Sequence, residues 1–128
     1  MKAHYTVALA LFAGFGLGAV AIHGLHAQAT PPVYLITEID VTDQENYMKD
    51  YGAPASAAIR AAGGRYVVQG GKTYPLDGEP PKGRVVVIAW DSIEKIQAWR
   101  GSTAWKELQP IREKVARFRS FAVEGLLQ

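Results

Sequence analysis

The sequence predicts an α+β fold of the ferredoxin-like kind, an antiparallel sheet with its helices on one face. Two observations carry this prediction. Four segments have the composition and alternation of strands, and the order along the chain is strand, helix, strand, strand, helices, strand, which is the βαββαβ arrangement. The chain has 128 residues, 48% of them hydrophobic and 20% charged, so we expect one globular domain.

Charge and cysteine content narrow the function classes. The chain carries 14 Lys and Arg against 12 Asp and Glu, a formal charge of +2. This balance lacks the basic excess by which proteins track phosphates, so we expect no nucleic-acid partner. There is no cysteine, which excludes disulfides and a lipid-anchored lipoprotein.

The first residues have the layout of a secretory signal peptide. Lys2 precedes an uncharged run over residues 7–22, and Ala27-Gln28-Ala29 forms a small-x-small site before Thr30. We therefore expect residues 1–29 to be a signal peptide cleaved near Ala29, leaving residues 30–128 as a single exported, periplasmic domain. The alternative is an uncleaved N-terminal anchor, the one case in which we expect the membrane as a partner.

Cleavage would also remove every histidine. His4, His23 and His26 all lie within the predicted signal peptide. A mature domain without His or Cys has no Ser-His-Asp or Cys-His relay, no zinc site of the usual ligands and no His- or Cys-held haem. We therefore expect no cofactor and no metal.

The first strand is predicted over residues 33–41, and both of its faces begin apolar. Thr42 and Glu45 have the spacing of a capping box, which predicts a helix beginning at Thr42. Pro54 predicts a kink near Gly52, and the Gly63-Gly64 pair predicts the end of this helix.

Two further strands are predicted over residues 65–69 and 84–90, separated by a glycine- and proline-rich loop over residues 70–83. That loop is either a lid or the tip of a hairpin. The strand over residues 84–90 is apolar on both faces, so we expect it to be central.

The C-terminal third is predicted as two helices and a strand. Asp91 and Glu94 favour a helix start, Gly101 a break, and Ser102 the cap of the next helix. A helical repeat continues as far as Phe118, and the last strand is predicted over residues 120–124.

One face of such a sheet has no helices. It would carry Tyr34, Ile36 and one side of the strand over residues 84–90, which are mostly apolar. A large exposed apolar surface favours burial, and a second copy packed about a two-fold axis would bury it. We therefore expect a homodimer.

Short motifs along residues 33–125 together resemble a known family, the domain of unknown function 1330, within the dimeric α+β barrel superfamily. The motifs are Gly63-Gly64-Arg65, Gly70-Gly71, the turn from Gly78 to Pro81, Arg84-Val85-Val86-Val87, Trp99 with Ser102, Ile111-Arg112 and Val123-Glu124-Gly125.

The resemblance implies a ferredoxin-like subunit and a dimer whose paired sheets enclose a pocket, without implying a particular reaction. Relatives in the superfamily include cofactor-free oxygenases, isomerases and haem-binding enzymes; the haem branch is disfavoured because no histidine remains. The chain departs from the usual pattern at Arg100 and at Trp105, where tyrosine is expected.

Glu38 is the best candidate for a catalytic residue. It lies on the strand face assigned to the barrel interior, where desolvation would raise the pKa of its carboxyl and make it a general base. The alternative is a structural carboxylate that pairs with an arginine.

The other candidates have similar pairs of interpretations. Arg65 and Arg84 would clamp a substrate carboxylate or protect strand edges, and the tryptophans would form an aromatic wall or ordinary core. Gly70-Gly71 would hold an anion or make a turn, and the cluster from Arg112 to Arg119 is interpreted as a solvated helix face. The complete set of pocket candidates is Tyr34, Glu38, Arg65, Arg84, Trp90, Trp99 and Ser102.

These observations predict a dimer that binds a small aromatic or carboxylated molecule. Three hypotheses follow: a cofactor-independent isomerase or oxygenase that works through Glu38 and an arginine, a non-catalytic binding or stress-related module, and a purely structural dimer with a filled interior.

Overall fold

The computed structural model describes residues 30–127, so the predicted signal peptide over residues 1–29 lies outside the described residues. The elements are β1 (Val33–Val41), α2 (Gln44–Asn46), the π-helical turn η1 (Tyr47–Gly52), α3 (Ala53–Ala61), β2 (Arg65–Gln69), β3 (Arg84–Trp90), α4 (Ile93–Arg100), α5 (Thr103–Val115) and β4 (Ala116–Glu124). No helix within residues 30–127 is long and apolar enough to span a bilayer.

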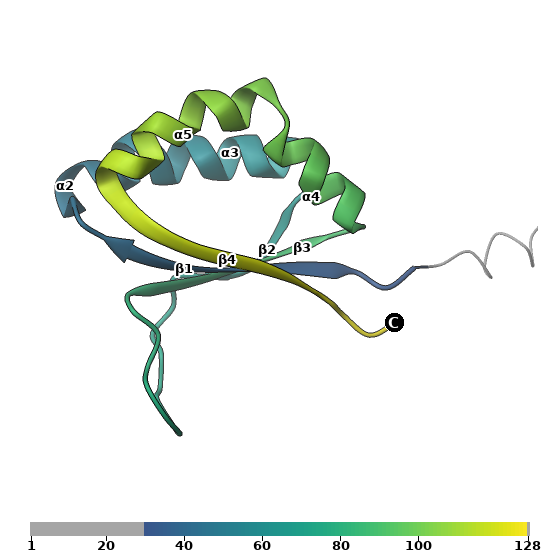
Figure 1. Cartoon of the computed structure of the whole chain (residues 1–128), viewed down its shortest axis with the longest axis horizontal. Coiled ribbons are helices and arrows are strands. Elements are labelled where there is room, and N and C mark those ends of the chain that lie inside the picture. Colours follow the sequence, from purple (N-terminus) through teal and green to yellow (C-terminus); the bar gives the residue numbers. More distant parts are fainter. Residues whose placement is uncertain (1–29, 128) are drawn as a thin grey trace, which may run out of the picture. The chain divides into compact units, whose positions relative to one another are not determined.

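The four strands form one sheet in the order β2-β3-β1-β4, and every neighbouring pair is antiparallel. β3 is therefore internal, as predicted, and shares the centre of the sheet with β1. Helices α3, α4 and α5 cover the same face of the sheet (Figure 1). The predicted ferredoxin-like α+β fold is confirmed.

The strand alternation decides which residues form the core. Val33, Leu35, Thr37 and Ile39 of β1 are buried beneath the helices, and the residues between them point to the other face. Trp90, at the end of β3, is fully buried in the same core. The face beneath the helices is called the inner face below, and the opposite face the outer face.

Two helix starts differ from the prediction by one residue. The cap of α2 is Asp43 rather than Thr42, because the backbone N–H of Asn46 donates to Asp43 Oδ1 at 3.2 Å. The cap of α4 is Ser92 rather than Asp91, whose carboxylate pairs with Arg65 instead. In both cases the cap is the residue whose side-chain oxygen reaches the N–H three positions later.

The cap predicted at Ser102 is confirmed. Its Oγ accepts a hydrogen bond from the backbone N–H of Trp105 at 3.2 Å, at the first turn of α5. Gly101 separates α4 from α5, also as predicted.

The first helix is irregular where Pro54 predicts it. Proline has no N–H to donate, and the turn before it widens into η1, in which the N–H of Ala53 donates to the carbonyl of Met48 five residues earlier. This wider turn leaves Tyr47 and Tyr51 both buried against the sheet.

The last strand begins earlier than predicted. β4 starts at Ala116, so Phe118 belongs to the strand and not to the preceding helix. The helix ends at Val115, whose carbonyl accepts hydrogen bonds from the N–H groups of Thr42 and Asp43. The spacing of three residues from Val115 to Phe118 is one that a continuing helix would also have. The periodicity of the sequence therefore does not reveal that the chain changes from helix to strand between Val115 and Ala116.

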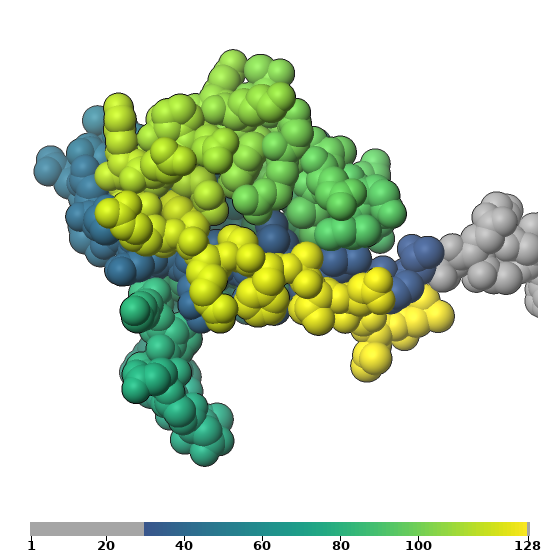
Figure 2. Space-filling view, in the orientation of Figure 1, coloured from purple at the N-terminus to yellow at the C-terminus, as the bar shows by residue number. Residues whose placement is uncertain are grey.

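The loop over residues 70–83 extends away from the helix layer, as a projection of the teal segment below the sheet (Figure 2). Near its tip, Tyr74 and Leu76 are 72% and 89% exposed. The loop therefore joins β2 and β3 as an extended hairpin connection and does not cover the helix side of the sheet.

Candidate functional site

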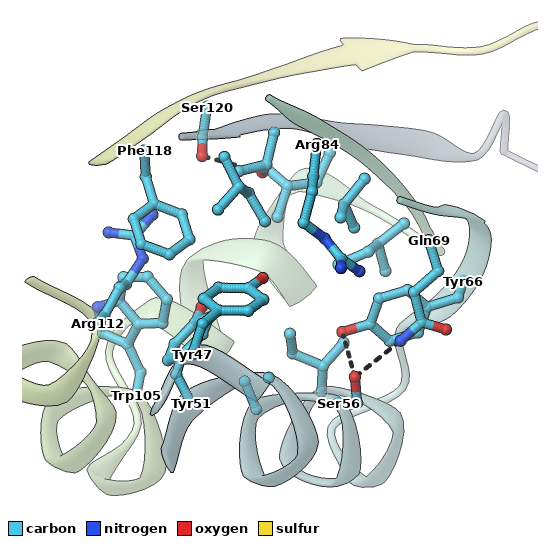
Figure 3. A pocket seen from close by; sticks show the side chains of 18 of the residues that line it. Tyr47, Tyr51, Ser56, Tyr66, Gln69, Arg84, Trp105, Arg112, Phe118 and Ser120 are labelled. Carbon is cyan, nitrogen blue, oxygen red and sulfur yellow. Dashed lines mark hydrogen bonds between the residues drawn. The ribbon is translucent and has the colours of Figure 1, made fainter. Parts of the chain in front are cut away.

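A cavity of about 70 Å³ lies between the helices and the inner face of the sheet. Its walls combine aliphatic residues of the sheet with aromatic and cationic residues of both layers (Figure 3). The polar and aromatic lining residues are Thr37, Tyr47, Tyr51, Ser56, Tyr66, Gln69, Arg84, Trp99, Arg100, Trp105, Arg112, Phe118 and Ser120.

The sheet register sets these side chains out in rows. Ile39 of β1 is paired with Arg84 of β3 on one side and with Phe118 of β4 on the other. One row along, Thr37 is paired with Val86 and Ser120, and the hydroxyls of Thr37 and Ser120 lie 3.0 Å apart. Because side chains alternate between the two faces of a sheet, the side chains of these residues all lie on the inner face, toward the helices.

Arginines Arg84, Arg100 and Arg112 converge on the cavity, each against an aromatic ring. The Arg84 guanidinium carbon lies 5.4 Å from the Tyr47 ring centroid. That of Arg112 lies 3.8 Å from the Phe118 ring and 4.8 Å from the Trp105 ring, and that of Arg100 lies 4.5 Å from Trp105. Stacking of this kind fixes a guanidinium while leaving its edge free to donate hydrogen bonds.

The positive charge of the cavity has no matching negative charge. Among residues 30–127, no aspartate or glutamate lines it. The Nε atoms of Arg84 and Arg112 are buried and have no hydrogen-bond partner within the described part of the chain. Burial lowers the pKa of the Arg112 guanidinium, because removing water disfavours the charged form. The cavity is therefore an electropositive site with unused donors.

Tyr47 and Tyr51 add neutral donors to the same site. Burial raises the pKa of both phenols above the ordinary value of 10.0, and the nearby cations Arg84 and Arg112 only partly oppose this. Both hydroxyls are therefore protonated at neutral pH. The two rings lie 5.9 Å apart, and Tyr51 meets Phe118 edge to face at 5.3 Å.

Gly70 makes room for Arg84. A Cβ atom at this position would lie 2.5 Å from an Nη atom of Arg84, and the backbone φ of +73° is one that residues with side chains rarely adopt. The sequence predicts either an anion site or a turn at Gly70-Gly71. The structure gives the first of these glycines a turn conformation and a second role, as the floor beneath the Arg84 guanidinium.

Comparison with known proteins places this fold in a family. The family described as domain of unknown function (DUF1330) matches residues 32–126. The chain belongs to the DUF1330 family. The resemblance seen in the sequence motifs is thereby confirmed. A comparison with curated proteins gives no match.

Solved structures share the fold of this DUF1330 chain at low identity. A protein of unknown function from Rhodopseudomonas palustris, RPA0582, has 16% identity and a TM-score of 0.63, with 84% of this chain and 93% of that chain covered. Its methylated form has 14% identity and a TM-score of 0.62, with 83% and 90% covered.

A third relative carries a suggested activity. A conserved protein of unknown function from Bacteroides thetaiotaomicron, described as a "possible oxidoreductase", has 14% identity and a TM-score of 0.57. The alignment covers 76% of this chain and 100% of that chain. At this identity the likeness shows the fold alone.

Two of the predicted pocket candidates, Arg84 and Trp99, line the cavity between the helices and the sheet. Trp90 lies in the core and Ser102 caps α5, although Ser102 also donates to the carbonyl of Trp99 at 2.6 Å. Arg65 is exposed and pairs with Asp91 at 3.0 Å.

Tyr34 and Glu38 lie on the outer face, opposite the cavity. Glu38 accepts a hydrogen bond from Arg119 Nε at 3.2 Å. This is the face where the sequence analysis placed the dimer interior, so Glu38 stays a candidate only for a pocket formed between two sheets.

Sequence reasoning missed Tyr47, Tyr51, Tyr66, Arg112 and Phe118 as cavity residues. The prediction of a solvated helix face is wrong for Arg112, because its side chain is half-buried between Trp105 and Phe118. It is also wrong for Arg117 and Arg119, which lie in β4 and not on a helix. The available signal was the Ile111-Arg112 motif within an apolar repeat. Among the described residues, no group of His, Cys, Asp or Glu is arranged to hold a metal ion.

Proposed function

We propose that this protein binds a small organic anion, a short carboxylate, in the cavity between the helices and the inner face of the sheet. The observation that carries the proposal is the convergence of Arg84, Arg100 and Arg112 on a cavity that, within residues 30–127, no acidic side chain lines. Arg84 and Arg112 are half-buried, and a partly buried cation without a counterion is destabilising, which a bound carboxylate would relieve.

The free donors suit a carboxylate. Arg84 and Arg112 each bring a buried Nε with no partner among the described residues, and guanidinium groups match carboxylates by paired hydrogen bonds. Each such charge-assisted bond contributes about 1.5 to 3 kcal/mol. The hydroxyls of Tyr47 and Tyr51 are further donors for the carboxylate oxygens.

The size of the cavity limits the ligand. Its volume of about 70 Å³ is smaller than the ~150 Å³ of a cavity that encloses benzene. A slender acyclic acid, whose far end can extend out of the cavity, therefore fits better than a rigid aromatic one. Leu35, Ile39, Val86 and Ile88 give its carbon chain an apolar wall, and the exposed Met48 lines the opening through which a longer ligand would extend.

The lining favours binding over catalysis. With no carboxylate or imidazole lining the cavity within residues 30–127, proton abstraction near neutral pH has no general base there. The alternative is a cofactor-independent isomerase or oxygenase, with Glu38 in a second pocket between two sheets. Its supporting observation is that the Glu38 side chain is only 28% exposed although it lies on the uncovered face.

The outer face supports a homodimer as part of the proposal. Phe121 and Val123 of β4 are each 46% exposed, and their partners Ile36 and Tyr34 on β1 lie beside them. A second copy packed on this face would bury the patch. The proposal also keeps export to the periplasm, on the sequence of residues 1–29.

Titration calorimetry with short carboxylates and their uncharged amides tests the proposed binding. We expect the acids to bind and the amides not to bind, and Arg84→Gln and Arg112→Gln each to weaken binding at least about tenfold, from the loss of one charge-assisted bond. The matched control is Arg117→Gln, on the outer face, which should bind normally. Equal binding of acid and amide, or normal binding by both cavity variants, would contradict the proposal.

The variant Glu38→Gln separates the alternatives. If the inner cavity is the site, this variant binds carboxylates with unchanged affinity. If the enzyme hypothesis is right, it loses turnover of the substrate while its thermal unfolding and its circular dichroism stay unchanged.

A further inference from the structure

We propose that the cavity also recognises a second group of its ligand, a carbonyl oxygen, through the hydroxyl of Tyr66, so that the preferred ligand is a short oxo acid. This inference rests on the carboxylate binding proposed above. It names the ligand class more closely.

The cavity has two chemically different ends. Tyr66 and Gln69 lie on β2 at one edge of the sheet, and Phe118, which carries the stacked Arg112, lies on β4 at the other edge. Three strand spacings of about 4.8 Å separate these edges. Figure 3 shows Tyr66, Gln69 and Ser56 together on one side of the cavity, Arg112 with Phe118 on the other, and Arg84 between them.

The end at β2 holds an ordered chain of hydrogen bonds. Arg60 donates from Nη2 to Gln69 Oε1 at 3.4 Å, Gln69 donates from Nε2 to Ser56 Oγ at 2.9 Å, and Ser56 donates to the Tyr66 hydroxyl oxygen at 3.3 Å. Arg60 fixes the direction of this chain, since a guanidinium can only donate. It therefore must face the amide oxygen of Gln69, which turns the amide nitrogen toward Ser56.

The last member of the chain keeps a free donor. A phenol has one hydrogen to donate, and the Tyr66 oxygen already accepts from Ser56, so its own hydrogen is available to another group. Tyr66 is half-buried and lines the cavity. The chain therefore ends in a hydroxyl that can satisfy an acceptor inside the cavity.

The charges assign a neutral acceptor to this end. Arg60, whose guanidinium carbon lies 4.9 Å from the Tyr66 ring centroid, does not line the cavity and donates to exposed Gln69. The cations that do line the cavity lie on β3, α4 and α5. A ligand with its carboxylate on Arg84 and a carbonyl oxygen toward Tyr66 matches both ends. Arg84 is one strand away from β2, which suits a short chain.

A comparison of three acids tests this assignment, using calorimetry on the purified full protein. Levulinate has a carboxylate and a carbonyl, pentanoate has the same chain length without the carbonyl, and glutarate has a second carboxylate instead. We expect levulinate to bind about fivefold more tightly than pentanoate, which is the usual effect of one neutral hydrogen bond. In the Arg112→Gln variant, where the second carboxylate of glutarate cannot pair with Arg112, glutarate should bind more weakly than levulinate.

The variant Tyr66→Phe should abolish the difference between levulinate and pentanoate and leave pentanoate binding unchanged. The matched control is Tyr74→Phe, in the exposed loop, which should keep the difference. Ser56→Ala provides a second test that keeps the Tyr66 hydroxyl in place. In this variant the Tyr66 hydroxyl no longer accepts the hydrogen bond from Ser56 that orients it. The preference for levulinate over pentanoate should therefore become smaller.

Each outcome decides between the two proposals. Equal binding of levulinate and pentanoate by the unmodified protein, equal loss of both in Tyr66→Phe, or tighter binding of glutarate than of levulinate by Arg112→Gln would overturn the assignment of Tyr66 while the carboxylate site stands. If none of the three acids binds, the carboxylate site fails and the assignment fails with it.

Discussion

The inner and outer faces of this sheet are made by the same strands, but within the described part of the chain charged side chains are paired on the outer face and unpaired on the inner face. On the outer face, Glu38 and Arg119 are cross-strand neighbours and form an ion pair at 3.2 Å. On the inner face, Arg84 and Arg112 are half-buried against aromatic rings, and no acidic residue within residues 30–127 lines the cavity they share. Matched charge is what a sheet surface needs for structure, whereas unmatched buried charge indicates a ligand.

The two faces also differ in how their apolar groups are covered. Leu35 and Ile39 on the inner face are buried by helices of the same chain. Ile36 and Phe121 on the outer face are covered by no helix of the described chain, and Phe121 stays partly exposed. The proposed ligand binding therefore concerns the inner face, and the proposed self-association concerns the outer face.

The largest expected effect comes from a charge placed on the outer face. Phe121→Asp should weaken the proposed dimer about 100-fold, because burying a carboxylate at the interface costs several kcal/mol and the neighbouring Arg119 is already paired with Glu38. Sedimentation equilibrium measures the dissociation constant. The control Leu126→Asp lies beyond β4, at an exposed position, and should leave the dimer intact. A dimer unaffected by Phe121→Asp, or a monomer to begin with, would contradict the assignment of this face.

A smaller effect is expected at the floor of the inner cavity. Gly70→Ala should destabilise the fold by about 1 to 2 kcal/mol, because its φ is positive, and should weaken carboxylate binding by displacing Arg84. Gly71→Ala is the matched control, since a Cβ atom there meets nothing within 4 Å. Urea unfolding and calorimetry measure the two effects. Equal behaviour of both variants would show that Gly70 has no special role.

The smallest expected effect is alkaline sensitivity. Burial raises the pKa of Tyr47 and Tyr51, so above the ordinary value of 10.0 the unfolded chain loses phenol protons before the folded chain does. The folded state then binds more protons, and the free energy of unfolding falls as the pH rises above that value. Below it, both states are protonated and the two phenols contribute no pH dependence.

Urea unfolding between about pH 8 and about pH 11 tests this expectation. The variant Tyr47→Phe should remove roughly half of the tyrosine-dependent decline, and Tyr74→Phe, an exposed tyrosine, should remove none. A decline of the same size in the Tyr47→Phe variant would contradict the role of burial.

Much of the fold could be predicted because strand periodicity is a strong local signal. The bounds of β1, β2 and β3 agree with the prediction, and the internal place of β3 follows from its two apolar faces. The errors in the helix and strand bounds lie where helical and strand periodicity both fit the sequence, and where two adjacent residues could each cap a helix. Phe118 fits a helix and a strand equally well by spacing, and Thr42 and Asp43 are adjacent residues that are both of a type that caps helices.

The site was harder to predict because it depends on which face of β1 meets the helices. Both faces of this strand begin apolar, so the sequence favours a pocket on either side, and Glu38 and Tyr34 were chosen from the outer one. Arg84 is predicted because an arginine at the start of a strand could clamp a carboxylate, the same reason that selects Arg65, which the structure places outside the cavity. Arg112 is not predicted, because a helical arginine is most often solvated and only the packing of α5 on Phe118 shows otherwise.

The π-helical turn makes the cavity sensitive to chain length. Such a turn holds about one residue more than an α-helical turn and is equivalent to a one-residue insertion into a helix. Deletion of one residue within η1 would rotate the preceding positions by about 100° around the axis, and Tyr47 would leave the sheet while Tyr51 stayed. The number of residues between the cap at Asp43 and the proline at position 54 thus determines whether one phenol or two line the cavity.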